Sequence, residues 1–324
     1  MFLIFTEQSF FMNIPVLDLS LFTKGNDDDK ANFVSTLGNT FESIGFVSIK
    51  NHGIDEKLIT DLYAVVEEFF SMPTDIKKRY EIENLAGQRG YTSFGKEHAK
   101  GSHNADLKEF FQFGQPTSSK DTNPDILTNV QVAENQLFNN CLSASFLQFE
   151  KLGSYILQAI SIYLGLPSNY FDDYIIDGNS IIRAIHYPPI VSEPNSSIRA
   201  EQHEDINLIT LLVGASSEGL QILSKNNIWL PINAASGEIV VNVGDMLQRL
   251  TNNKLKSTTH RVVNPPREKW NSSRYSIPFF LHPVSTMSLS CLPSCISEEN
   301  PSSYIDYTAG EYLDERLREI GLKK

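Results

Sequence analysis

The run Ile181-Ile182-Arg183-Ala184-Ile185-His186-Tyr187 opens a β-rich stretch that continues to residue 281. Short runs of β-branched and aromatic residues recur through this stretch and are separated by turn residues. Several short strands at such spacing are typical of a β-sandwich or barrel. The further predicted strands are 206–213, 220–223, 239–243, 257–263 and 275–281.

The sequence before residue 179 is mostly helical in pattern. Apolar residues at helical spacing predict helices over 31–44 and 58–70, with a strand at 46–49 between them, and Asp55 is suited to cap the second helix. A longer helical pattern runs from about 135 to 164, and an amphipathic one covers 307–322. The predicted class is therefore mainly β with flanking helices. We divide the chain into an N-terminal helical and strand cap (1–120), a long connecting helix (121–178), a β core (179–290) and a helical tail (291–324).

Composition limits the classes of partner. The 324 residues are 41% apolar and 20% charged, as in globular proteins, and carry a net charge of −12. That charge argues against nucleic acid and anionic membranes as partners, and no apolar run is long enough to span a bilayer. Three cysteines without a fourth zinc ligand indicate buried thiols in a reducing compartment, so we expect a cytoplasmic protein. Met1 and Met12 both remain possible starts.

The segment His203-Glu204-Asp205 is the first candidate for chemistry. Residues i and i+2 of a strand point to the same face, so one imidazole and one carboxylate should converge. His260, in the predicted strand 257–263, can supply a third ligand. Two histidines and one carboxylate that leave open positions form the facial triad of non-haem Fe(II) oxygenases. A zinc hydrolase is the rival, although such enzymes favour a helical pair of histidines or a tetrahedral set.

A candidate anion site follows on the next predicted strand. Arg274 and Ser276 are two residues apart in the predicted strand, so their guanidinium and hydroxyl groups should point to the same face. This pair suits a carboxylate, which an arginine can hold through two hydrogen bonds. The structural alternative is that Arg274 forms a surface ion pair.

Taken in order, these residues resemble the Fe(II)- and 2-oxoglutarate-dependent dioxygenases, in particular the isopenicillin N synthase-like branch. The resemblance covers nearly the whole chain. It includes further motifs at residues 14–19, 45–54, 89–91, 186–189, 210–212, 219–221 and 260–263.

The resemblance implies a double-stranded β-helix, or jelly-roll, core that holds iron at its mouth, with the N-terminal helices packed outside. It implies that His203, Asp205 and His260 bind Fe(II). It further implies that 2-oxoglutarate chelates the metal, that O₂ is the oxidant and that ascorbate supports activity.

The resemblance also assigns the cosubstrate's distal carboxylate to Arg274 and Ser276. Tyr187 matches a position that often donates its hydroxyl to the same carboxylate, and packing is the alternative for it. Arg183 shares the face of Tyr187 and is a second possible anchor. Two departures are the 14-residue interval from His260 to Arg274 and the residue Ile185, where many plant members carry Asn.

The expected activity is hydroxylation or desaturation of a small organic molecule, coupled to conversion of 2-oxoglutarate to succinate. One alternative is an Fe(II) oxidase that needs no 2-oxoglutarate, and another is a catalytically silent small-molecule-binding protein. We expect a monomer or weak homo-oligomer, and structural or surface roles for His52, His98, His103, His186 and His282. The residues predicted to line the substrate entrance are Arg89, Tyr91, Phe111, Phe113 and Phe280.

Overall fold

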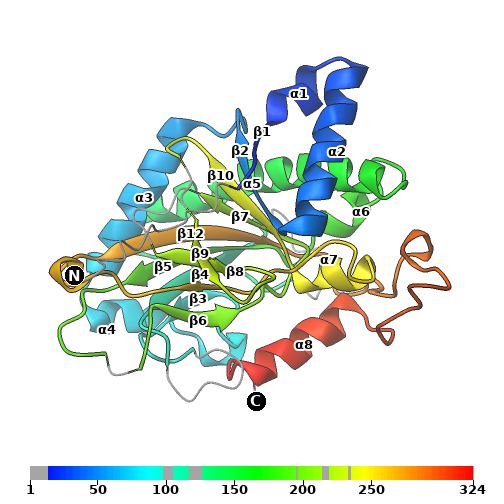
Figure 1. Cartoon of the computed structure of the whole chain (residues 1–324). Coiled ribbons are helices and arrows are strands. Elements are labelled where there is room, and N and C mark those ends of the chain that lie inside the picture. Colours follow the sequence, from blue (N-terminus) through cyan, green and yellow to red (C-terminus); the bar gives the residue numbers. More distant parts are fainter. Residues whose placement is uncertain are drawn as a thin grey trace, which may run out of the picture.

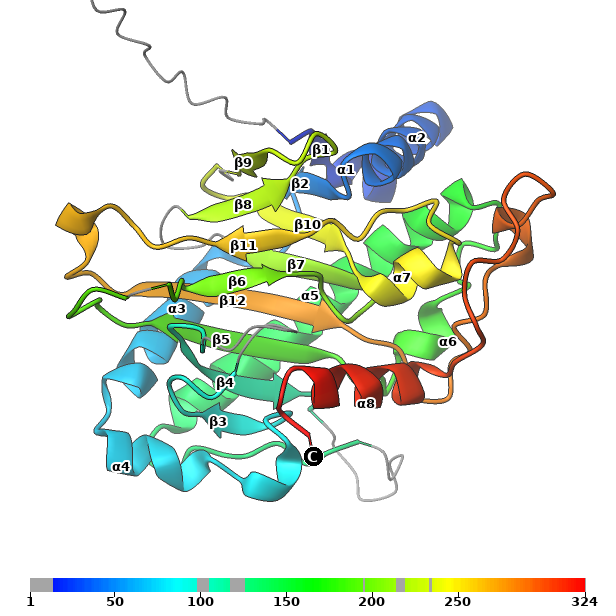
Figure 2. The same ribbon diagram turned by 60° about the horizontal axis from the view of Figure 1, so that its bottom comes forward.

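The computed structural model describes residues 14–97, 105–116, 126–194, 196–213, 219–232 and 235–323. Two β-sheets form the centre of this part of the chain, and helices cover the outer face of the larger sheet (Figure 1). The smaller sheet lies on the opposite face of the larger one (Figure 2). The mainly β class with flanking helices, predicted from the sequence, is confirmed.

The larger sheet contains β1 (Val16–Asp18), β2 (Phe46–Lys50), β3 (Gly90–Thr92), β4 (Glu109–Gly114), β5 (Ile181–Tyr187), β7 (Ile209–Val213), β10 (Ile239–Val243) and β12 (Arg274–Leu281). Its order is β1-β2-β10-β7-β12-β5-β4-β3, and only β1 and β2 pair in parallel. The strands β1 to β4 come from the predicted N-terminal cap. That region therefore extends both edges of the sheet as well as supplying helices outside it.

The smaller sheet contains β6 (Ala200–His203), β11 (His260–Val262), β8 (Leu220–Leu223) and β9 (Trp229–Pro231), in that order. All of its pairs are antiparallel. Apolar clusters join the two sheets, since Ile222 of β8 packs with Val240 of β10, and Val262 of β11 packs with Ile185 of β5. This pair of facing sheets is the predicted jelly roll.

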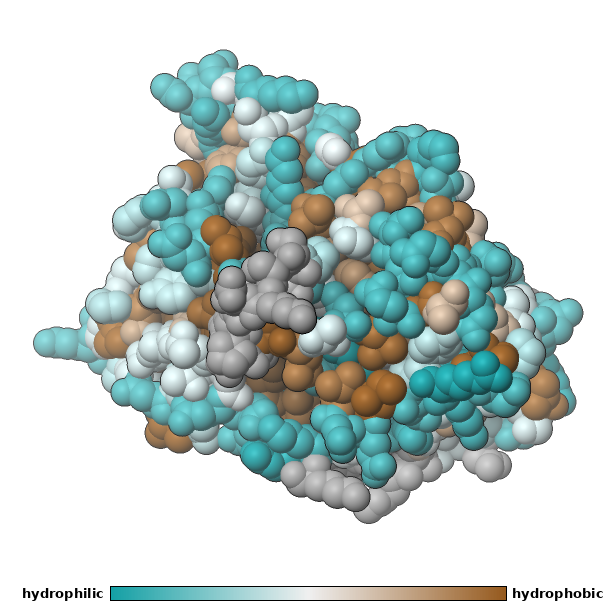
Figure 3. Space-filling model, turned by 180° about the vertical axis from the view of Figure 1, so that it is seen from behind, coloured by the Kyte–Doolittle hydropathy of each residue, from teal (hydrophilic) through white to brown (hydrophobic). Residues whose placement is uncertain are grey.

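The helices are α1 (Leu19–Lys24), α2 (Asp27–Ser43), α3 (Glu56–Ser71), α4 (Thr74–Lys77), α5 (Gln136–Tyr163), α6 (Asp172–Ile175), α7 (Asp245–Leu250) and α8 (Ala309–Glu319). The long helix α5 packs on the larger sheet, and α2 and α3 pack on α5. Side chains of apolar and hydrophilic character are mixed on the rear face of the molecule (Figure 3). The tail helix α8 lies on the other side of the larger sheet, beside the smaller sheet (Figure 2).

Most predicted elements occur where the pattern placed them. The predicted strands 181–187, 220–223 and 239–243 coincide with β5, β8 and β10, and Asp55 caps α3 through a bond from the Lys57 N–H. The predicted strands 206–213 and 257–263 each begin three residues before β7 and β11. No pattern identified β3, β4, β6, β9 or α7.

Alternation along β12 separates the two faces of the larger sheet. Ile277 and Phe279 point to the helices and belong to the main apolar core. Arg274, Ser276 and Phe280 point the other way, into a cavity between the sheets. One strand thus supplies both core packing and the polar lining of the cavity, as a period of two requires.

Replacing Phe279 with Ala should lower the free energy of unfolding by about 3–5 kcal/mol, because a large core side chain leaves a cavity. Phe279 is fully buried, and its ring centroid lies 5.1 Å from that of Phe146 and 5.8 Å from that of Phe149, both on α5. Chemical denaturation measures the loss. As a control, Phe94→Ala should change the value by at most about 0.5 kcal/mol, since Phe94 is 49% exposed. Equal effects of the two substitutions would contradict this packing.

Candidate metal centre and active site

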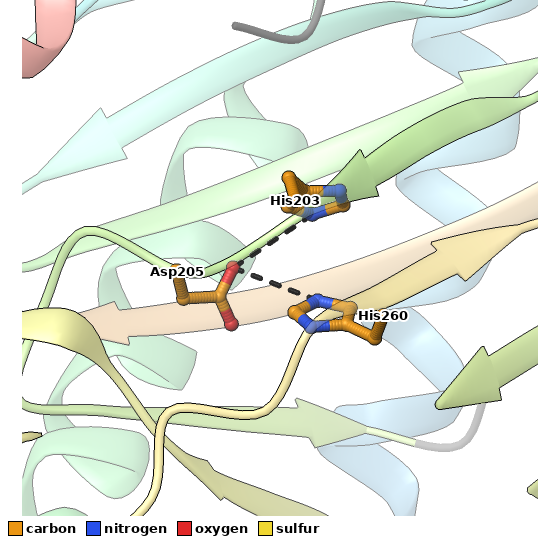
Figure 4. Close-up of side chains that lie close together, drawn as sticks. All are labelled: His203, Asp205 and His260. Carbon is orange, nitrogen blue, oxygen red and sulfur yellow. Dashed lines mark ion pairs between the residues drawn. The ribbon is translucent and has the colours of Figure 1, made fainter. Parts of the chain in front are cut away.

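Two histidines and an aspartate lie close together where β6 ends and β11 begins in the smaller sheet. His203 ends β6, His260 begins β11, and the two residues are directly paired in the ladder. The Nε2 atoms of His203 and His260 lie 3.9 Å and 3.8 Å from Oδ1 of Asp205 (Figure 4). One ligand atom from each residue lies within 4.8 Å of the other two. This spacing allows all three atoms to contact a single metal ion.

The route by which Asp205 reaches the site differs from the prediction. His203 and Asp205 were expected to share the face of one strand, but β6 ends at His203 and Asp205 lies two residues beyond it. The carboxylate is brought back by the turn after β6, where the Asp245 N–H donates to the Asp205 carbonyl oxygen. The predicted convergence is therefore found, with a different physical cause.

Backbone carbonyl groups orient both imidazoles. Nδ1 of His203 lies 2.6 Å from the carbonyl oxygen of Glu201, and Nδ1 of His260 lies 3.1 Å from that of Thr258. A carbonyl oxygen only accepts hydrogen bonds, so these contacts assign the proton to Nδ1 of each ring. Each Nε2 atom then carries a lone pair directed at Asp205, which is the arrangement that a metal-binding histidine needs.

Two neutral donors hold the carboxylate of Asp205. The Thr210 hydroxyl and the Asn242 amide donate to Oδ2 at 2.6 Å and 2.8 Å, and Oδ1 faces the imidazoles. Burial alone would raise the pKa of Asp205, but the positive charge that His260 and His203 carry when protonated, together with these two hydrogen bonds, lowers it overall. The carboxylate is therefore ionised at neutral pH. Two unprotonated imidazole nitrogens and one carboxylate oxygen fit a divalent iron ion.

A cavity of about 670 Å³ opens from this triad between the two sheets. Arg274 and Ser276 line it, are almost fully buried, and share the face of β12 as predicted. Tyr187 lies opposite Arg274 in the β5–β12 ladder, and its ring centroid is 4.9 Å from the guanidinium carbon. The structure therefore brings the predicted metal and carboxylate residues into one cavity. Of the residues predicted at the substrate entrance, Phe280 also lines it.

The other four residues predicted at the entrance do not line this cavity. Tyr91, Phe111 and Phe113 are packed in the main apolar core between the sheet and the helices. Arg89 is buried beside Gly114, where its guanidinium donates to the carbonyl oxygens of Gln88 and Leu127. The reason is the period of two along β4, which turns residues 111 and 113 to the helices.

Polar residues on β4 and around it line the cavity, and sequence reasoning missed most of them. Lys108 and Gln112 line the cavity together with Glu97, Asp106 and Arg183. Lys108 contacts Glu97 at 2.6 Å and Asp106 at 2.8 Å, and Arg183 contacts Glu97 at 3.2 Å. The sequence held one signal: Lys108 stands next to the aromatic run 110–113, and a charged residue that is buried beside such a run is almost always paired. The sequence did not show which side of that run faces the cavity.

Electrostatics keep Glu97 and Lys108 ionised at neutral pH. Burial alone would raise the pKa of Glu97, but Arg183 and Lys108 lower it to about 2. Burial alone would lower the pKa of Lys108, but Glu97 and Asp106 raise it. These groups therefore compensate one another beside the metal site.

The remaining histidines have different environments. His52 accepts from the Ile54 N–H, and His186 contacts Glu109 and Ser273 on the helix side of β5, so both are structural as expected. His282 was expected to have a structural or surface role, and the structure places it in the lining of the cavity just after β12. His98 and His103 lie outside the described residues.

Comparisons with known proteins bear on the family. Residues 14–135 match the family described as non-haem dioxygenase in morphine synthesis N-terminal, and residues 178–283 match the 2OG-Fe(II) oxygenase superfamily. The 2-oxoglutarate-dependent dioxygenase htyE of Aspergillus rugulosus is 30% identical, over 94% of this chain and 98% of its own length. This chain belongs to the 2OG-Fe(II) oxygenase superfamily.

Solved structures agree with this assignment. A 2OG-Fe(II) oxygenase family protein from Caulobacter crescentus is 40% identical, with a TM-score of 0.84, over 95% of this chain and 99% of its own. A full-length protein of Neurospora crassa, solved in complex with alpha-KG, is 29% identical, with a TM-score of 0.83, over 97% of this chain and 98% of its own. The same Neurospora protein was also solved with alpha-KG and thymine together.

The family and the enzymatic class predicted from the sequence are thus confirmed. The oxygenase depends on Fe(II) and on 2-oxoglutarate as cosubstrate, and it acts on a small molecule. None of the described helices combines the length and the apolar character that crossing a bilayer requires.

Glu97→Gln should destabilise the oxygenase by about 3 kcal/mol at pH 7, because it removes the carboxylate that pairs with Arg183 and one of the two that pair with Lys108. The folded pKa of Glu97 is about 2 and lies below its ordinary value of 4.5. Its contribution is therefore fully present above pH 4.5 and is lost as the pH falls toward 2. Urea unfolding should show a constant difference in the free energy of unfolding between wild type and mutant from pH 8 to pH 5. This difference should become smaller below pH 5.

The matched control for this substitution is Glu193→Gln. Glu193 is 64% exposed and pairs with Arg267 at 3.1 Å. A surface pair of this kind contributes at most about 1 kcal/mol, so the control should change stability little at any pH. A Glu97→Gln effect no larger than that of the control would contradict the buried cluster.

Proposed function

We propose that His203, Asp205 and His260 hold the Fe(II) of this oxygenase, and that Arg274 and Ser276 hold the distal carboxylate of 2-oxoglutarate. The activity is hydroxylation or desaturation of a small organic molecule. With both groups bound, iron and 2-oxoglutarate supply an oxidant from O₂ that attacks a C–H bond, and 2-oxoglutarate is converted to succinate and CO₂. The observation that carries this proposal is the triad of ligand atoms within 4.8 Å, with both Nε2 atoms free to bind a metal.

The position of Arg274 supports its proposed role. It lies on the rigid central strand β12, is 1% exposed and lines the same cavity as the triad. A guanidinium in a buried site binds a carboxylate strongly because little water competes with it. The Ser276 hydroxyl, two residues along the same face, can donate to the same anion. Tyr187 packs against Arg274 and keeps its guanidinium in the cavity.

The size of the cavity supports a second, small molecule beside the cosubstrate. Ligand sites commonly have volumes of about 300–1,000 Å³, so 670 Å³ accommodates 2-oxoglutarate and a compact substrate. The Neurospora relative binds alpha-KG and thymine in one structure, which supports such a pairing here. Walls from both sheets and from α8 would limit the access of water during oxidation.

We further propose a cytoplasmic enzyme that works as a monomer or a weak homo-oligomer. The three cysteines are buried and unpaired, which suits a reducing compartment. The proposed iron and cosubstrate residues all come from a single chain, so catalysis needs no second copy.

The direct test of the function is spectroscopic. Anaerobic addition of Fe(II) and then 2-oxoglutarate should produce a visible metal-to-ligand charge-transfer band, and air should then yield succinate. Asp205→Ala should abolish both signals, because two imidazoles alone bind iron weakly. Asp61→Ala, at an exposed site on α3, is the matched control and should retain both. Absence of the band at saturating cosubstrate would reject the proposal.

Arg274→Ala should weaken 2-oxoglutarate binding about 100-fold, because it removes a buried charge-assisted contact. Fe(II) binding should stay nearly unchanged, since Arg274 does not contact the triad in this account. Titrating the charge-transfer band with 2-oxoglutarate measures the first quantity, and metal titration measures the second. Arg261→Ala is the control, because Arg261 on β11 stacks on Trp229 away from the cavity. Loss of iron binding in Arg274→Ala would instead make this residue a structural support.

A further inference from the structure

The charges that line the substrate side of the cavity are almost all compensated within the protein. Glu97, Asp106, Lys108 and Arg183 form one connected cluster with two carboxylates and two cations. On α8, Arg316 pairs with Glu319 at 2.9 Å. A substrate that carried a full charge would meet groups that are already neutralised.

Arg183 in particular has little capacity left for an anion. Its Nη1 atom contacts both carboxylate oxygens of Glu97 at 3.2 Å, and its Nε atom donates to Gln112 at 3.1 Å. Its guanidinium carbon also lies 4.4 Å from the ring centroid of Phe110 and 5.2 Å from that of Phe280. It therefore acts as a fixed part of the cavity wall rather than as a second carboxylate anchor.

Two other acidic residues border the cavity. Glu204 is exposed and accepts from the Thr259 hydroxyl at 2.8 Å, so it lies in water. Asp245 is half-buried, and its carboxylate accepts from the Tyr312 hydroxyl of α8 at 3.2 Å. Glu204 is therefore exposed to water, and Asp245 is held by α8.

The cavity also has a third histidine, His282, besides the two of the triad. It lines the cavity, is 6% exposed, and its Nδ1 atom has no hydrogen-bond partner among the described residues. Its backbone is fixed, because the His282 N–H donates to the Ser180 hydroxyl, which in turn donates to the His282 carbonyl oxygen. Burial lowers the pKa of its ring to about 3, so the imidazole is uncharged at neutral pH. A buried polar atom without a partner costs stability, and a ligand can supply that partner.

Apolar groups surround the same space. They are Phe280, two residues before His282 in the chain, Leu313 and Leu317 of α8, and Ile320 directly after that helix. The cavity thus combines an uncharged hydrogen-bonding group, His282, with apolar side chains in its lining. Such a lining selects for compact molecules that bury an apolar face and satisfy one polar group.

We propose that the imidazole of His282 hydrogen-bonds the primary substrate and orients it at the metal, and that this substrate is an uncharged molecule. The proposal rests on the proposed function, since it assigns the substrate side of that site. His282 is a specificity-determining residue here, distinct from the metal ligands and from the residues assigned to 2-oxoglutarate.

The first test needs no substrate. His282→Phe should leave the melting temperature equal to or above that of the wild type, because an unsatisfied buried nitrogen is removed. His186→Phe is the matched contrast, since His186 is also buried but both of its ring nitrogens are bonded. That substitution should lower the melting temperature. A clear loss of stability in His282→Phe would show a structural histidine and overturn the proposal.

The second test uses two molecular skeletons, each in an uncharged, an anionic and a cationic form. Indole-3-acetamide is compared with indole-3-acetate and tryptamine, and thymine with orotate and 5-aminomethyluracil. The rate of succinate formation above the substrate-free rate is measured for the Fe(II) enzyme. Binding is measured by the thermal shift of the Mn(II) and 2-oxoglutarate complex. At least one uncharged member should bind about tenfold or more tightly than its charged partners.

The same assays on variants assign the effect to His282. His282→Phe should raise KM for the preferred probe about tenfold by removing one hydrogen bond, and His282→Asn should restore part of the affinity. The charge-transfer band with 2-oxoglutarate should be unchanged in both variants. A charged probe that binds as well as its uncharged partner, or a panel in which no uncharged member binds, would overturn the proposal. The charge-transfer band tests the proposed iron and 2-oxoglutarate sites without any substrate. Failure of the proposed function can therefore be distinguished from failure of the role proposed for His282.

Discussion

The register of a single strand pair, β6 with β11, brings together the two histidines that we propose as metal ligands. It places His203 directly opposite His260, at the open side of the smaller sheet. Backbone carbonyl groups then fix both rings so that their Nε2 atoms point the same way. Asp205 completes the set only because Thr210 and Asn242, on two strands of the larger sheet, hold its other oxygen. A shift of one residue in either sheet would turn a ligand or its support out of the cavity.

In the larger sheet, successive side chains of each strand point to opposite faces, so one face forms the apolar core and the other lines the cavity. Its outer face is covered by α5 and carries the apolar core, including Ile277 and Phe279 of β12. Its inner face carries Arg274, Ser276 and Phe280 from the same strand. Rigid packing on one side therefore fixes the positions of polar side chains on the other. This support explains how a buried arginine and a buried ion cluster can be maintained beside a solvent-accessible metal site.

Short motifs made the metal and carboxylate residues predictable, while the substrate side was not. His203, Asp205, His260, Arg274 and Ser276 were recognisable by residue type and spacing, and the structure brings them into one cavity. Phe111 and Phe113 were assigned to the substrate entrance but lie in the core, because the face of β4 depends on which residues of β5 it pairs with. His282 could not be found from sequence, since its significance lies in a missing hydrogen-bond partner, and only three-dimensional packing shows that. Local patterns thus indicate the residues proposed as ligands, whereas the lining of the rest of the cavity depends on long-range strand pairing.

A crystal structure with Mn(II) in place of Fe(II), and with 2-oxoglutarate, tests the central claim most directly. The account predicts a single metal ion bound by Nε2 of His203, Nε2 of His260 and Oδ1 of Asp205, identified by its anomalous scattering. It also predicts the distal carboxylate of 2-oxoglutarate at Arg274 and Ser276. A metal bound elsewhere, or a cosubstrate whose distal carboxylate contacts Arg183 instead, would contradict it.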